Sequence, residues 1–86
     1  MAEWLRPNWW VWDLKLTLHV QWRMEERGLS EIALRRLLDI AQRIKHGRVP
    51  GRFEVTGRFH DRTWTVVLEP DFEREVIVVV TVFPTR

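Results

Sequence analysis

The stretch from Val76 to Phe83 constrains the fold of this chain more than any other feature. Every position in it is apolar except Thr81. A strand with one face in water alternates apolar and polar residues, so this continuous run predicts a strand that is covered on both faces. Pro84 follows and ends it, because proline cannot donate to a sheet ladder. We therefore expect a central strand near the C-terminus.

Two stretches ahead of this strand alternate with a period of two, which is typical of strands that turn one face toward a core. Apolar residues fall on one side of residues 53–60 and 64–69, namely Phe53, Val55, Phe59, Trp64, Val66 and Leu68. The pairs Asp61-Arg62 and Pro70-Asp71 favour tight turns after each stretch. Together with residues 76–83, they predict a three-stranded antiparallel meander.

Two helices are expected in the first half of the chain. Thr17 is a suitable N-cap for a helix to about Arg27, and Gly28 can take the left-handed conformation that ends it. Ser30 caps a second helix, which Gly47 stops. The pairs expected to face the core from the first helix are Leu18 with Trp22 and Val20 with Met24. The second carries an apolar stripe at helical spacing, formed by Leu34, Leu37, Leu38, Ala41 and Ile44.

Residues 9–16 alternate as well, which predicts a short N-terminal strand. The expected fold class is α+β, with this strand and the two helices followed by the meander, which packs on the second helix. A length of 86 residues allows one domain over residues 1–86. Within it, residues 1–16 form a Trp-rich N-terminal segment that precedes residues 17–84.

The composition limits the chemistry that the chain can perform and the compartments in which we expect it. The chain has no cysteine, so neither a disulfide nor a thiolate is available, in accord with a reducing compartment. Glu3, Arg6 and Pro7 interrupt the region where a secretory signal would be apolar, and residues 76–80 are too short to span a bilayer. We expect a cytoplasmic protein. Large indole side chains take the place of a larger core, from Trp4, Trp9, Trp10, Trp12, Trp22 and Trp64.

The positive charge is concentrated in the middle of the chain. Residues 35–62 hold eight Lys or Arg and three Asp or Glu, whereas the segments on either side are mildly acidic. Nearly all of these cations are arginines, which suit bidentate contacts with phosphate. A phosphate-binding patch and ordinary surface charge both account for this distribution.

The first candidate site is the series His19, Arg23 and Arg27, whose spacing of four places them along one helix face. His19 falls in the first turn, where the helix dipole favours the neutral imidazole that can accept a proton. A base with two guanidinium groups is a set that phosphodiester cleavage requires. A solvated face of an amphipathic helix explains the same pattern.

The second candidate is a cationic face of the first meander strand, which would contact RNA phosphates through Arg52, Arg58, His60 and Arg62. An exposed sheet face gives the same pattern. Thr81 is the third candidate, since a hydroxyl in an apolar strand needs a partner, which is either local backbone or a site. The histidines lack metal-ligand spacing and the chain has no Gly-rich phosphate loop. We expect neither a metal nor another cofactor.

The run from His19 to Ser30, HVQWRMEERGLS, resembles the "H…RM.ERG(I/L)S" segment of a family of small bacterial domains of unknown function. Residues 64–70 and 78–84 are similar to the sheet of that family, so the likeness covers about residues 17–84. The family looks related to the barnase–EndoU–colicin–RelE-like superfamily of metal-independent ribonucleases, many of them toxins. The resemblance implies helices followed by an antiparallel sheet. It also implies an acid/base role for His19, phosphate binding by Arg23 and Arg27, and Thr81 on the floor of the site.

The leading hypothesis is therefore a metal-independent endoribonuclease of toxin or phage-related type, in which the ribose 2′-hydroxyl attacks the adjacent phosphate. The alternative is a non-catalytic module of the same fold that binds RNA or a protein partner. The expected partners are RNA and an antitoxin or other protein, with no membrane. A homodimer through the Trp-rich N-terminal segment is a further interpretation.

Overall fold

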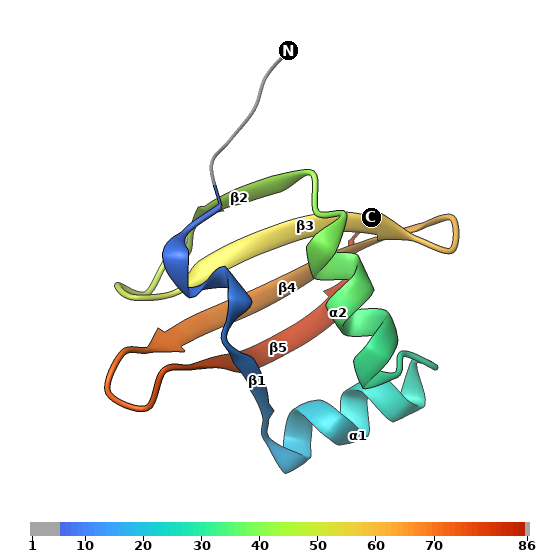
Figure 1. Cartoon of the computed structure of the whole chain (residues 1–86). Coiled ribbons are helices and arrows are strands. Elements are labelled where there is room, and N and C mark those ends of the chain that lie inside the picture. Colours follow the sequence, from blue (N-terminus) through green and yellow to red (C-terminus); the bar gives the residue numbers. More distant parts are fainter. Residues whose placement is uncertain (1–5, 86) are drawn as a thin grey trace.

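The computed structural model describes residues 6–85, which form one five-stranded sheet with both α-helices on the same face (Figure 1). The sheet order is β1-β5-β4-β3-β2. The elements in chain order are a 3-10 helix η1 (Asn8–Val11), β1 (Asp13–Leu16), α1 (Leu18–Glu26), α2 (Glu31–Asp39), β2 (Arg43–His46), β3 (Phe53–Phe59), β4 (Arg62–Asp71) and β5 (Val76–Pro84).

The sheet is mixed. Strands β2 to β5 follow one another as an antiparallel meander, and β1 joins the outer side of β5 in parallel, with Asp13 beside Val76 and Leu16 beside Val79. The α+β class and the order of strand, helices and sheet are confirmed. The prediction of a three-stranded meander was wrong, because the meander has four strands.

The additional strand comes from residues that the sequence assigned to the second helix. Helix α2 ends at Asp39, and β2 follows at Arg43. Ile44 is seven residues after Leu37, which fits a helix stripe, but it also alternates with charged neighbours. Pairing of Ile44 with Val55 supplies β2 with backbone partners and half-buries its side chain. Tertiary pairing therefore overrode the helical spacing.

The predicted starts of α1 and α2 and the predicted end of α1 are confirmed. The Thr17 hydroxyl accepts a hydrogen bond from the Val20 N–H at 3.1 Å, and the Ser30 hydroxyl accepts one from the Ala33 N–H at 3.0 Å. Gly28 has a φ of 71°, the left-handed conformation that lets the chain leave α1. These caps fix where the two helices begin and how the short loop between them turns.

The predicted strand over residues 9–16 forms only in its second half. Residues 8–11 are a 3-10 helix, and the strand begins at Asp13. A strand would send Trp9 and Trp10 to opposite faces, whereas the tighter coil lets both indoles enter one core, each 6% exposed. Trp12 is half-buried, and Trp4 lies outside the described residues.

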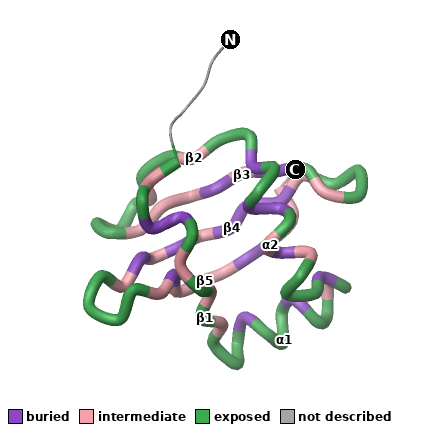
Figure 2. Tube along the Cα trace, in the orientation of Figure 1, coloured by how far each residue is buried: buried purple, intermediate pink, exposed green. Residues whose placement is uncertain are grey.

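The core lies between the sheet and the helices (Figure 2). Leu34, Leu37 and Leu38 of α2 are fully buried, which confirms that the sheet packs on this helix. β5 lies between β1 and β4, so it is an interior strand, but β4 is the central strand of the sheet. Only one face of β5 is fully covered, the face that carries Ile77 and Val79. The expectation of cover on both faces was wrong, because both helices occupy one side.

Helix α1 lies against β5 and turns Val20 and Met24 into the core, as predicted. The expectation that Leu18 and Trp22 also face the core was wrong: they are 72% and 70% exposed. A nine-residue helix at the margin of a small sheet has only one covered side, and these two residues lie on the other. Within residues 6–85, no helix is both long and apolar enough to cross a membrane.

Candidate functional site

A small cavity lies where the loop after α1 meets the β3–β4 hairpin. Its volume is about 290 Å³, at the lower end of the range for small-molecule sites. The loop brings Arg27 from the first predicted cluster to His60 and Arg62 from the second. The lining residues are Arg27, Gly28, Leu29, Phe59, His60, Asp61, Arg62 and Trp64.

The hairpin turn that forms one wall is held in a costly conformation. Phe59 and Arg62 are the last paired residues, so His60 and Asp61 form a two-residue loop. Their φ angles are 53° and 60°. This turn requires positive φ at both central residues and is usually built from Asn-Gly or Gly-Gly. Side chains other than glycine cost about 1–2 kcal/mol each in this region, and such strain concentrates at functional sites.

Arg27 closes the other wall. It is the C-cap of α1, and its Nη1 donates to the Val82 carbonyl oxygen at 3.2 Å. β1 pairs with β5 only as far as Val79, so the stretch of β5 around Val82 has no strand on its outer side. The half-buried Arg27 guanidinium covers this stretch. An arginine has five N–H donors, so this one bond fixes its position and leaves donors for an anion.

Trp64 lines the cavity with an indole that is almost wholly buried. The side chain is 4% exposed, and its Nε1 is buried without an acceptor among the described residues. The Arg62 guanidinium lies over the same indole, 5.7 Å from the ring centroid. A cation over an indole face contributes about 0.5–1 kcal/mol at an exposed site. The indole therefore helps to hold the Arg62 side chain at the cavity.

The charges around the cavity favour an anion. Arg27 and Arg62 outnumber the one carboxylate, on Asp61. That carboxylate is fully exposed and lies 3.9 Å from Arg58 on the outside of the hairpin, a separation at which an exposed pair contributes little. The exposed ring of His60 meets Phe59 edge to face, with 4.2 Å between centroids. Two cations, the imidazole of His60 and the aromatic rings of Phe59 and Trp64 thus surround one space.

The remaining predicted site residues lie apart from this cavity. His19 and Arg23 are exposed on α1, and eight residues of helix separate His19 from Arg27, a rise of about 12 Å. Thr81 pairs with Val67 on the sheet face opposite the helices, where it is half-buried. Thr81 therefore does not line the cavity.

Arg52 is also apart, because its Nε donates to Glu69 Oε1 at 2.8 Å near the far end of the hairpin. Trp64, Phe59 and Leu29 were not singled out as site residues. For Trp64 the sequence held a usable signal: an inward-facing indole directly after a turn that ends in a cationic side chain.

Among residues 6–85, no group of three or more His, Asp or Glu side chains is placed to hold a metal ion. No model of a known protein family, no curated protein and no solved structure matches this chain.

Proposed function

We propose that this chain binds single-stranded RNA, with one phosphate and its nucleotide in the cavity between Arg27 and Arg62. The observation that carries this proposal is the meeting of two guanidinium groups with the aromatic side chains of Phe59 and Trp64 around one cavity. Guanidinium N–H groups are donors suited to phosphate or base oxygens, and arginine is the cation that matches phosphate geometry. The cavity is too small for a duplex but has the size for one nucleotide.

The exposed side of α1 extends this site. His19 and Arg23 continue from Arg27 along the helix, and Trp22 lies exposed beside them. Single-stranded nucleic acids are bound by such combinations of cations that follow the backbone and aromatic faces on which bases stack. Stacking on one indole contributes about 1–3 kcal/mol. An RNA strand along α1 would thus enter the cavity at Arg27.

The test is fluorescence anisotropy with a labelled single-stranded RNA of mixed sequence at low salt. We expect Arg62→Ala to weaken binding about tenfold or more, the effect of one charge-assisted contact of about 1.4 kcal/mol or more. Arg36→Ala is the matched control, because it removes the same charge from an exposed position on α2 that does not line the cavity. Equal losses in both variants, or equal affinity for duplex RNA, would contradict the cavity as the binding site.

A second function, metal-independent cleavage of the bound RNA, has its own support in His60. This imidazole lines the same cavity as the two guanidinium groups. A neutral histidine can take the proton of the ribose 2′-hydroxyl as that oxygen attacks phosphorus and the bond to the 5′-oxygen breaks. The departing 5′-oxygen takes a proton from water, which leaves a 2′,3′-cyclic phosphate and a 5′-hydroxyl. The guanidinium groups would stabilise charge on the phosphorane.

Incubation of the protein with RNA in excess EDTA separates binding from cleavage. Cyclic phosphate ends that are lost in His60→Ala would support cleavage centred on the hairpin, and loss in His19→Ala alone would move the chemistry to the start of α1. Bound but intact RNA would leave the chain as a binding module.

A further inference from the structure

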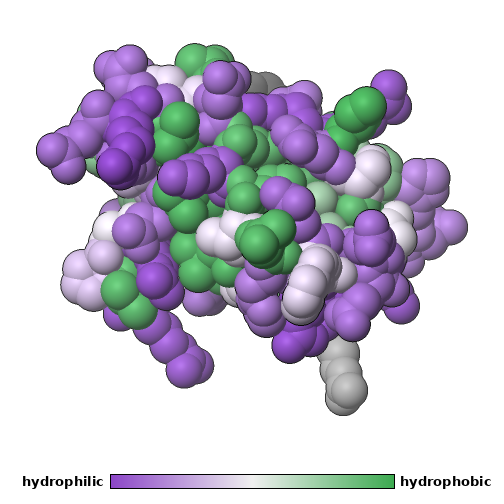
Figure 3. All heavy atoms as spheres, turned by 90° about the horizontal axis from the view of Figure 1, so that it is seen from below, coloured by the Kyte–Doolittle hydropathy of each residue, from purple (hydrophilic) through white to green (hydrophobic). Residues whose placement is uncertain are grey.

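A second and different surface lies on the other side of the loop after α1. Two adjoining hollows, of about 490 and 600 Å³, run between α1, the start of α2 and β1, and they share Glu31. Seen from below, the molecule shows apolar side chains gathered in the middle of its surface within a hydrophilic border (Figure 3). The apolar lining consists of Leu14, Leu16, Met24, Leu29 and Ile32. We call this surface the α1–α2 groove.

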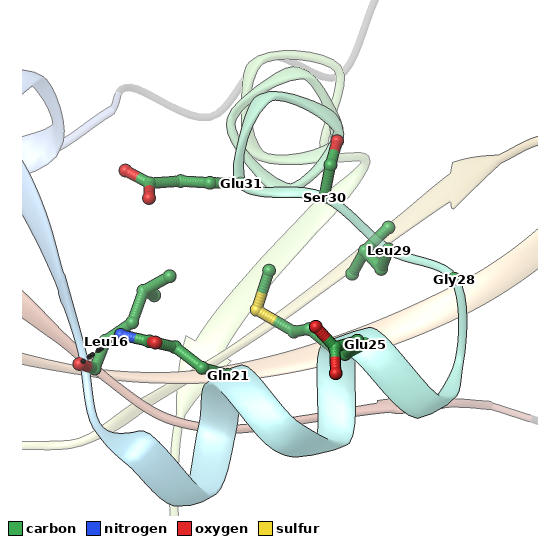
Figure 4. A pocket seen from close by; sticks show the side chains of 8 residues that line it. Leu16, Gln21, Glu25, Gly28, Leu29, Ser30 and Glu31 are labelled. Atoms are coloured by element: carbon green, nitrogen blue, oxygen red, sulfur yellow. Dashed lines mark hydrogen bonds between the residues drawn. The ribbon is translucent and has the colours of Figure 1, made fainter.

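The floor of the α1–α2 groove is part of the folded core. Met24 and Leu29 are 3% and 4% exposed, and Leu14 and Leu16 are half-buried. Met24 and Leu29 both line the hollow of about 490 Å³ between the helices, and Figure 4 shows Leu29 in the loop that joins them. A thioether is flexible and polarizable, so it can adjust to apolar side chains of different shape. The groove is thus suited to a few inserted apolar side chains.

The rim of the groove is acidic, in contrast to the RNA site. Glu31 reaches from the start of α2, Glu25 projects from α1 opposite (Figure 4), and Asp13 lies at the β1 end. Among the described residues, none of these three carboxylates forms an ion pair. Arg35 is the one cation in the lining, and its guanidinium donates to the Trp10 and Trp12 carbonyl oxygens.

We propose that the α1–α2 groove binds a basic amphipathic helix of a partner protein, with its apolar side chains on Met24 and Leu29 and its lysines or arginines on the carboxylate rim. Charge complementarity selects this occupant. The groove carries three acids and one base although the whole chain has a net charge of +2. An RNA strand would be repelled here, and an amphipathic helix in an apolar groove is a common mode of recognition.

The groove and the RNA site share only the loop between them. Gly28 and Leu29 line both the groove and the 290 Å³ cavity. The two ligands carry opposite charge, so each surface repels the ligand of the other. The partner site therefore does not depend on the proposed RNA function, and it stands if RNA binding fails.

The experiment uses a synthetic 15-residue amphipathic Leu/Lys peptide as the probe and a Leu/Glu peptide of the same pattern as its counterpart. With the isotope-labelled protein, we expect the Leu/Lys peptide to shift the amide NMR signals of residues around Leu16, Met24 and Glu31 and to bind at micromolar concentration. The Leu/Glu peptide should bind at least tenfold more weakly. Signal shifts centred on the β3–β4 hairpin or on the open sheet face would overturn the proposal.

The variant Glu25→Lys/Glu31→Lys should weaken binding of the Leu/Lys peptide at least tenfold. Asp39→Lys/Glu54→Lys is the matched control, because it makes the same change in net charge at the end of α2 and on β3, at residues that do not line the groove. Equal losses in the two variants would show general charge attraction and overturn the proposal. Glu25→Gln/Glu31→Gln gives a second measurement if charge reversal at the start of α2 prevents folding, and it should weaken binding in the same direction.

Discussion

Gly57 lies where β3 passes beneath α2, and a larger residue would require α2 to shift by a few tenths of an ångström. A Cβ at this position would meet the Leu37 carbonyl oxygen at 3.1 Å and the Ala41 Cα at 3.4 Å. The carbonyl belongs to helix backbone, so it cannot move aside as a flexible side chain would. Close approach of backbone is one of the reasons for glycine inside a strand.

We expect Gly57→Ala to lower the free energy of unfolding by about 1–3 kcal/mol, the usual cost of overpacking a core. Urea denaturation measures this loss. Thr56→Ala, on the neighbouring position that faces away from α2, is the control and should change stability by no more than about 0.5 kcal/mol. An unchanged midpoint for Gly57→Ala would mean that α2 packs less closely on β3 than described.

Asp71 accepts hydrogen bonds from two backbone N–H groups in the β4–β5 turn, those of Glu73 and Arg74, each at 3.1 Å. The bond from the Arg74 N–H is the largest cause that lowers the pKa of this carboxyl below 3.8, and the Arg74 guanidinium at 3.2 Å adds to it. Because the folded pKa is below the unfolded one, this stabilisation is complete above pH 3.8 and is lost as pH falls through the folded value.

A carboxyl-carbon NMR titration should therefore place the Asp71 midpoint below pH 3.8. In Arg74→Ala the midpoint should rise but remain below the ordinary value, because the two backbone donors stay in place. A wild-type midpoint at or above 3.8 would contradict the turn geometry.

At the level of elements, the β3–β4 hairpin places a turn with two positive φ angles at the wall of the candidate cavity. If His60 serves RNA, replacement of the strained His-Asp pair by an Asn-Gly pair should raise stability and lower RNA affinity together. We expect His60→Asn/Asp61→Gly to stabilise the fold by about 1–2 kcal/mol, since both residues then tolerate positive φ. Thermal unfolding and RNA anisotropy measure the two effects.

Asp61→Gly alone is the matched control for this prediction. It relieves strain at one residue and removes an exposed carboxylate but keeps the imidazole, so stability should rise while RNA binding is retained or improved. Unchanged RNA binding in the double variant would show that the imidazole takes no part in recognition.

Strands with strong alternation and helices with clear caps could be predicted from the sequence, whereas β2 could not. The Thr17 and Ser30 caps are local hydrogen bonds, so local sequence determines them. The residues of β2 carry both periodicities, and only their pairing with β3, a contact between elements, selects the strand. The candidate cavity had the same difficulty: Arg27 and Arg62 were each recognised by residue type, but their meeting depends on the tertiary approach of a loop and a hairpin.

At the scale of the whole molecule, residues 9–16 pack as part of the core and of the sheet. β1 covers the outer side of β5, and the indoles of Trp9 and Trp10 are buried within the chain itself. Those two side chains therefore serve intramolecular packing, and a homodimer through the Trp-rich segment stays a prediction. The interpretation of residues 1–16 as a Trp-rich segment and of residues 17–84 as a family-like core stays a prediction.

We expect a chain that begins at residue 17 not to unfold cooperatively, because it lacks β1 and two buried indoles that each bury about 150–250 Å². Near-ultraviolet circular dichroism and amide NMR dispersion test this. Addition of a peptide of residues 6–16 should restore part of the signal. A well-dispersed spectrum of the shortened chain alone would show that residues 17–86 form a complete core.

The parallel pairing of β1 with β5 has a consequence for synthesis on the ribosome. Leu16 can pair with Val79 only after Val79 has been synthesised, so β1, the first strand of the sheet, cannot pair until most of β5, the last strand, has been made. At about 5–20 residues per second, that wait is roughly 3–12 s. During this time Trp9 and Trp10 have no sheet to cover them, so the nascent chain offers chaperones an apolar segment that the finished protein conceals.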